Sequence, residues 1–363
     1  MKRILSICTL ICGVIVSKAQ NNVSEIIGAG LIAAQDYADS YVQPAGESFA
    51  FNLSTGWYDD AKVLDKWKFE ISLRGQATFT PDDKRSFTLD PSRYAELIQE
   101  NYDSSGNPPA RIEVTFADGS SDPRQIATAL GSNVPSEFLL IRAMDGTTGF
   151  EIDSSRIELG QGLESEGVNF IPTVFVQAGL GLGNGLELKA RFMPRVQIYE
   201  SEATLWGGAL QWEFSKLFED DQGVSAFPLR LAFLAGYTTV NAQYDFEDGI
   251  VVAGTNQTIE AQASTLTLAG IVSTRWKYFN FFGGVNYANG STQSDLLGTY
   301  TIQSNSVIYP LSTTFNDPIT VNTDASMLMG TLGAKLSLGF FSLHGSYTFS
   351  EFSTANAAVA FKF

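Results

Sequence analysis

The chain has 363 residues, with 39 acidic and 23 basic side chains and a formal net charge of −16. So acidic a chain is a poor partner for nucleic acid or for an anionic lipid surface, and we expect neither as a ligand. After residue 19 no run of eighteen apolar residues occurs, which excludes a membrane-spanning helix. A mean hydropathy of +0.01, 12% aromatic residues and 33 glycines favour a β-barrel, whose strands are apolar on one face. A large soluble array of β-sandwiches is the alternative.

The N-terminus has the pattern of a secretory signal peptide. Two basic residues precede an apolar run over residues 4–16, and small residues stand three and one positions before Gln20. The pattern predicts that residues 1–19 are removed after Ala19, since the run is too short to span a membrane. Both cysteines lie inside this segment. The mature chain is therefore expected to have neither a disulfide framework nor a thiolate metal site.

Residues 20–46 predict a separate helical segment. Apolar side chains recur at helical spacing from Ile26 to Tyr41, and Pro44 and Gly46 predict its end. A segment placed before the first strand could plug a barrel lumen or lie at its mouth. An ordinary amphipathic helix without a gating role is the alternative.

An antiparallel transmembrane barrel is predicted over residues 47–363. Its clearest hairpin joins strands at 168–182 and 186–199 through Gly183-Asn184-Gly185, because an Asn-Gly turn between alternating runs is a strong hairpin signal. Charges on one face of the second strand cannot face lipid, so that face points inward. Twelve strands are expected, or fourteen if the region 80–160 adds a pair. The other ten lie at 48–57, 65–78, 134–143, 203–215, 228–246, 258–277, 279–288, 325–338, 341–350 and 354–363.

The last strand predicts the location of the protein. It alternates strictly and ends on Phe363, which resembles the C-terminal signal that the barrel-insertion machinery of the outer membrane reads. Counting strands back from this end places the tight turns in the periplasm and the long loops outside. The same count places an insertion at residues 80–133 in the periplasm or the lumen. It also makes the connection 216–227 unexpectedly long for a periplasmic turn.

Catalytic and metal motifs are absent from the sequence. The single histidine, His344, stands two strand positions from Ser342 and Ser346, about 6.6–7 Å away, which is too far for a nucleophile and its base. We therefore expect a polar lumen residue, and a barrel hydrolase is the distant alternative. Acidic clusters such as 118–122 lack the ligand spacing of a calcium loop and are interpreted as solvated turns. No enzyme activity, metal or cofactor is expected.

Charged residues expected to face the lumen are the candidate solute contacts. They could bind an anionic solute, or they could pair with Glu70, Glu187 and Glu213 in a ladder that fills a narrow barrel. Five aromatic residues, Trp206, Trp212, Trp276, Tyr278 and Phe279, are expected at the two lipid interfaces. The candidate solute contacts are Lys68, Arg74, Glu187, Lys189, Arg191, Arg195, Arg230 and His344.

Two resemblances extend this interpretation. The stretches Asn169–Thr173 and Gly185–Arg195, with Leu343–Tyr347 and the aromatic terminus, resemble an uncharacterised outer-membrane barrel family of the Bacteroidota. That resemblance covers nearly the whole mature chain and implies no particular activity. Tyr41–Gly46 is more distantly similar to the N-terminal segment of long-chain fatty acid transporter barrels, with Gln43-Pro44-Ala45 where that family has Asn-Pro-Ala.

The function that we predict is therefore a non-enzymatic outer-membrane barrel. It would give passage to, or bind, a small hydrophobic or anionic solute, with membrane lipid and the insertion machinery as its other partners. The alternative is a structural or accessory barrel in a secretion or surface-assembly complex.

Overall fold

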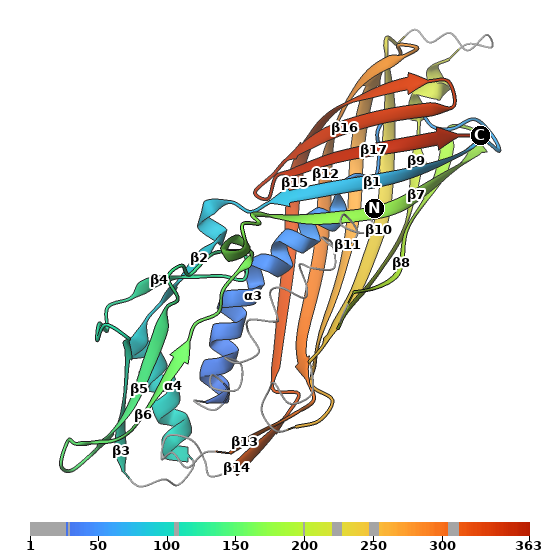
Figure 1. The fold of residues 1–363 in the computed structure, drawn as a ribbon. Coiled ribbons are helices and arrows are strands. Elements are labelled where there is room, and N and C mark those ends of the chain that lie inside the picture. Colours follow the sequence, from blue (N-terminus) through green and yellow to red (C-terminus); the bar gives the residue numbers. More distant parts are fainter. Residues whose placement is uncertain are drawn as a thin grey trace.

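The computed structural model describes residues 27, 30–104, 109–198, 200–219, 227–246, 254–303 and 312–363. The predicted signal peptide lies outside these residues. In the described part of the chain, ten antiparallel strands form one closed barrel in which each strand pairs with the next and the first pairs with the last (Figure 1). This confirms the predicted class. The barrel strands are β1 (Phe69–Phe79), β7 (Phe170–Gly183), β8 (Leu186–Ile198), β9 (Ser201–Trp212), β10 (Leu229–Asp245), β11 (Thr258–Thr274), β12 (Phe279–Leu297), β15 (Ile319–Leu338), β16 (Phe341–Phe349) and β17 (Thr354–Lys362).

The predicted strand number was wrong because two of the twelve alternating runs lie elsewhere. Residues 48–57 include the end of a helix, α3 (Leu31–Ser54), and residues 134–143 overlap β5 (Phe138–Asp145), which belongs to a separate sheet. Inside a barrel a helix is enclosed on all sides, and residues 50–55 are all buried. The sequence there is apolar enough to mimic a strand.

Helix α3 and the segment after it fill the barrel. The helix continues through Pro44 to Ser54, eight residues beyond the predicted end at Gly46, and Figure 1 shows that it bends along its length. Residues 55–66 then cross the lumen without regular structure before β1 begins. We call residues 55–66 the lumen segment, and α3 with the lumen segment the plug.

Apolar contacts fix the plug to the barrel wall. Phe51 of α3 packs with Met327 and Phe352, while Trp57 of the lumen segment packs with Leu234 and Phe282. These contacts place the end of α3 and the lumen segment inside the barrel, and the barrel begins at Phe69, not at residue 47.

The chain leaves the barrel between Phe79 and Phe170. This insertion packs a core against Tyr37 and Tyr41 of α3. It was predicted at the end that holds the C-terminus, but it lies at the opposite end, because β1 starts beside Phe363 and runs away from it (Figure 1, lower left). Its elements are η1 (Asp82–Lys84), β2 (Ser86–Leu89), α4 (Pro91–Ser104), β3 (Ala110–Phe116), β4 (Arg124–Ala127), β5, β6 (Glu151–Glu158) and η2 (Leu163–Glu166), with β2–β4 and β3–β5–β6 as its two sheets.

The two ends of the barrel differ in their connections. The end with Phe363, which we call the C-terminal mouth, holds the turns at 183–185 and 339–340 and the short helix η3 (Phe214–Phe218). The far end holds the insertion and the hairpin of β13 (Thr299–Gln303) and β14 (Ser312–Asn316). Several strands extend well beyond the rest of the barrel toward this far end.

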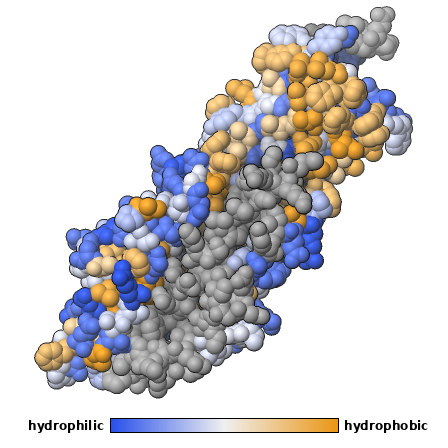
Figure 2. All heavy atoms as spheres, in the orientation of Figure 1, coloured by the Kyte–Doolittle hydropathy of each residue, from blue (hydrophilic) through white to orange (hydrophobic). Residues whose placement is uncertain are grey.

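An apolar belt surrounds the part of the barrel nearest the C-terminal mouth (Figure 2). On β12 the outward side chains are apolar from Phe279 to Tyr287, apart from Gly283, and polar from Asn289 to Asp295. The apolar stretch is about the length that a strand needs to cross a bilayer. No helix among the described residues is long and apolar enough to cross a membrane. All five aromatic residues expected at the lipid interfaces have exposed side chains.

Candidate functional site

The lumen segment carries a buried carboxylate, Asp59, that contacts basic side chains from three strands. Its oxygens lie 2.6 Å from Lys335 Nζ, 3.1 Å from Arg74 Nη2 and 3.2 Å from His344 Nδ1. All four side chains are buried. A buried charge is tolerated when opposite charges and hydrogen bonds compensate for lost water, and Asp59 receives both from the wall.

Arg191 of β8 binds the end of α3. Its Nη1 donates to the carbonyl of Leu53 (3.1 Å) and its Nη2 to that of Thr55 (2.6 Å), while its guanidinium carbon lies 3.6 Å from the ring centre of Trp57. The last carbonyls of a helix lack partners within the helix and carry partial negative charge. α3 has no basic residue in its last turn, so a strand of the wall supplies the cation.

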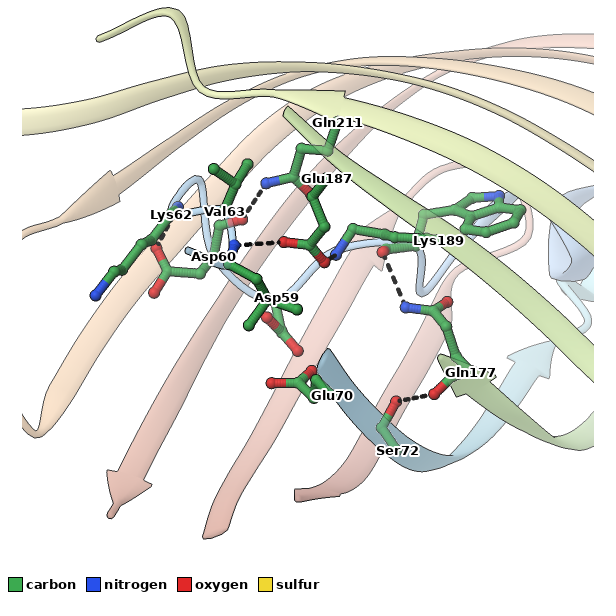
Figure 3. A network of polar contacts seen from close by, with 12 residues as sticks. Asp59, Asp60, Lys62, Val63, Glu70, Ser72, Gln177, Glu187, Lys189 and Gln211 are labelled. Carbon is green, nitrogen blue, oxygen red and sulfur yellow. Dashed lines mark hydrogen bonds and ion pairs between the residues drawn. The ribbon is translucent and has the colours of Figure 1, made fainter. Parts of the chain in front are cut away.

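Wall side chains also satisfy the backbone of the lumen segment (Figure 3). The Val63 and Leu64 amides donate to Glu213 (3.0 Å) and Glu187 (2.9 Å), and Gln211 Nε2 donates to the Asp60 carbonyl (3.0 Å). Buried backbone groups need such partners because no water reaches them. Glu213 follows directly after β9, and burial raises its pKa above that of an ordinary glutamate, although the Val63 amide and nearby cations oppose the rise.

A cavity of about 260 Å³ opens beside this network at the C-terminal mouth. Its lining mixes both signs of charge and continues to the aromatic rim at Phe340 and Phe363. The acidic lining residues are Asp59, Asp60, Asp65, Glu70 and Glu187, and the basic ones are Lys62, Lys68, Lys189, Lys335 and Lys362.

A family model matches the whole chain, residues 1–363, and its description reads "Family of unknown function (DUF6588)". The chain belongs to this family. The match agrees with the expected family without an assigned activity. The Bacteroidota origin of the DUF6588 chain and its likeness to fatty acid transporters stay predictions. No curated protein matches the chain.

Three solved structures similar to the DUF6588 chain are outer-membrane proteins. The protease OmpT of Escherichia coli is 9% identical over 84% of this chain and 100% of its own, with a TM-score of 0.30. The COG4313 outer membrane channel of Pseudomonas putida F1 is 9% identical over 85% and 100%, with a TM-score of 0.37. Ail of Yersinia pestis is 7% identical over 82% and 99%, with a TM-score of 0.24. Sequence identities and TM-scores this low support no conclusion about activity.

Five of the eight candidate solute contacts lie buried in the lumen, where the hairpin pattern placed them. They form part of the plug network instead of lining an open channel. Lys189 pairs with Glu187 at 2.6 Å, as a structural ladder requires. The buried five are Arg74, Glu187, Lys189, Arg191 and His344.

The other three candidates lie outside that buried group. Arg230 is mostly buried near the C-terminal mouth, where its Nε lies 3.6 Å from Glu213. Arg195 was expected to face inward but is exposed and pairs with Glu202, because a register shift between Met193 and Val196 changes the side on which it lies. Lys68 is also exposed, since it precedes the first residue of β1.

Sequence reasoning missed two central residues of the network, Asp59 and Lys335. Lys335 had a usable signal, because it shares the inward face of its strand with Met327, Met329 and Thr331. Asp59 had none, since the lumen segment has no period from which a direction could be derived.

Proposed function

We propose that the chain is an outer-membrane barrel that gives passage to, or binds, a small polar solute without enzymatic chemistry. The closed sheet with an outward apolar belt supports the location, since a lipid-exposed sheet must have no open edge. Secretion by the predicted signal peptide would bring the chain to that membrane. The C-terminal strand would then be read by the insertion machinery.

Passage requires the plug to move, because the plug fills the lumen at rest. The observation that carries this proposal is the position of Asp59 among Arg74, Lys335 and His344, beside a cavity open to one mouth. Polar contacts to an irregular segment can be exchanged for contacts with water or a solute when the segment shifts. The charged lining favours a polar solute over the hydrophobic one that was the other expectation.

Conductance of the refolded full chain in planar bilayers tests the proposal. The native barrel should stay closed, and Asp59→Asn should open it intermittently, because the amide no longer holds the wall cations by charge. Asp65→Asn is the matched control, since Asp65 lies exposed in the same segment and should leave the barrel closed.

A disulfide supplies the second arm of that experiment. A Cβ at Gly290 of β12 would lie 2.8 Å from both the Cβ of Ala50 in α3 and Oγ1 of Thr265. The helix must therefore move slightly away from the strand to reach the usual disulfide spacing of about 3.5–4.5 Å. With Ala50→Cys and Gly290→Cys added, oxidation should abolish the openings of Asp59→Asn, and reduction should restore them. Two results would overturn passage through a displaced plug. One is that the openings of Asp59→Asn persist when the disulfide is oxidised, and the other is that Asp59→Asn never opens.

The architecture of the far end favours a second candidate, an accessory barrel of a surface or secretion complex. There the strands extend past the apolar belt, and the insertion adds two small sheets outside the membrane zone. A binding protein needs such a projecting module, whereas a simple pore does not. Chemical crosslinking in the native membrane tests this role. Capture of one protein at fixed stoichiometry through residues of the insertion would support it, and crosslinking to no other protein would count against it.

A further inference from the structure

The cavity at the C-terminal mouth contains a second buried carboxylate, Asp60, that makes no direct ion pair within the described part of the chain. Asp60 is only 6% exposed, and its Oδ1 accepts hydrogen bonds from Ser273 Oγ (2.6 Å) and the Lys62 amide (3.0 Å). It makes no ion pair with any residue that the structure describes, whereas its neighbour Asp59 has three basic partners. Lys335 and Lys362 attract Asp60 only from beyond ion-pair distance. Direct contact with a positively charged group of a ligand would compensate the burial of this carboxylate further.

At the rim of the same cavity basic side chains outnumber acidic ones, because three lysines lie there beside one exposed carboxylate, Asp65. Lys62 and Lys68 line it with exposed side chains, and neither makes an ion pair within the described part of the chain. Lys362 adds a third ammonium, 3.5 Å from Glu70. A simple cation would be repelled at this rim before it reached Asp60, whereas a carboxylate would be attracted.

The arrangement of charges therefore selects a ligand that carries both signs. We propose that this cavity binds a small solute with a primary amine and a carboxylate, of the amino acid or short peptide class. Its ammonium lies at Asp60 and its carboxylate at Lys62 and Lys68. This inference rests on the proposed function, whose solute it specifies.

The size and position of the cavity agree with this ligand class. Its volume of about 260 Å³ lies below the ~300–1,000 Å³ of sites for drug-sized ligands. It opens at the C-terminal mouth beside the exposed rings of Phe340 and Phe363, so a solute reaches it without displacing the plug. Binding is thus separable from passage.

Isothermal calorimetry on the full chain in detergent micelles tests the inference with three probes. Alanyl-alanine should bind, whereas N-acetyl-alanyl-alanine, which lacks the amine, and alanyl-alanine amide, which lacks the carboxylate, should bind at least about tenfold more weakly, a difference of about 1.4 kcal/mol. No binding of the dipeptide, or equal binding of all three probes, would overturn the inference.

Substitutions locate the two charges of the ligand. Asp60→Asn should weaken dipeptide binding at least about tenfold, and Lys62→Gln with Lys68→Gln should reduce the preference for the free carboxylate. Lys277→Gln, exposed in a turn at the same mouth but outside the cavity, should change nothing. If Asp60→Asn does not fold, the inference is still tested by the native chain with N-acetyl-alanyl-alanine and alanyl-alanine amide, and by the lysine variants.

The outcomes for this inference and for the proposed function remain distinguishable. Dipeptide binding by a barrel that never conducts would overturn passage and leave the binding site standing. Conductance or uptake of other solutes, with no dipeptide binding, would overturn only the binding site.

Discussion

Asp59 and Lys335 meet at 2.6 Å although 276 residues separate them in the chain. One belongs to the lumen segment and the other to β15, so their contact joins the irregular interior to the wall. Arg74 of β1 binds the same carboxylate from another strand. This carboxylate therefore couples the plug to strands from both ends of the sequence.

Replacing Lys335 by methionine tests the strength of this coupling. The variant should lose about 3–5 kcal/mol of unfolding free energy, because a buried carboxylate would lose its nearest cation. Urea unfolding in detergent, followed by fluorescence, measures the loss. Asp59→Asn together with Lys335→Met should recover part of it, since the two residues interact directly. A double variant that is as unstable as the sum of the single ones would contradict a direct pair.

Arg191→Lys should fail to replace the arginine at the end of α3. Lysine keeps the charge but cannot bind the Leu53 and Thr55 carbonyls and Gln177 with one planar group, nor stack on Trp57 in the same way. We expect faster amide hydrogen exchange in residues 50–57 in this variant. Exchange at the native rate would show that the arginine contacts do not hold the helix end.

The apolar belt predicts where a charge is tolerated on one strand. Leu332 and Asn322 both face outward on β15, but Leu332 lies within the belt and Asn322 beyond it. Leu332→Arg should cost about 2–4 kcal/mol on refolding into lipid vesicles, and Asn322→Arg close to nothing. Equal costs would mean that the membrane boundary lies elsewhere.

Removing the insertion should expose the first half of α3. The Thr80 amide lies 3.2 Å from the Asn169 carbonyl, so a short turn can replace residues 81–168 without disturbing β1 or β7. Tyr37 and Tyr41 would lose the core that they share with the insertion. Limited proteolysis should then cut residues 31–45 while the barrel stays intact. Protection equal to that of the native chain would show that the strand extensions alone shield the helix.

The barrel strands were predictable because each has one apolar and one polar or small face. Eight were placed near their observed ranges, and the hairpin at Gly183–Gly185 fixed the inward direction of Arg191. The expected strands 279–288 and 325–338 were too short, because β12 continues to Leu297 and β15 begins at Ile319. The same pattern misled at residues 48–57, where the end of a helix is buried on every side, and at β5, whose sheet packs against α4 outside the barrel.

The candidate site was harder to predict than the barrel. Local sequence fixes the direction of a strand side chain, but it does not reveal a bulge such as the one that exposes Arg195. It also does not fix the path of the lumen segment, whose backbone hydrogen bonds come from Glu187, Gln211 and Glu213 on distant strands. That path becomes defined only once the barrel exists.

The path of the plug also links it to the strand that closes the barrel. Gln35 of α3 bonds to Thr320 at the far end, while the chain leaves the lumen at the C-terminal mouth to form β1. The plug therefore runs the length of the barrel interior and continues directly into β1, which pairs with β17. The plug and β1 are one continuous piece of chain, so any pull on the lumen segment acts directly on the pairing of β1 with β17.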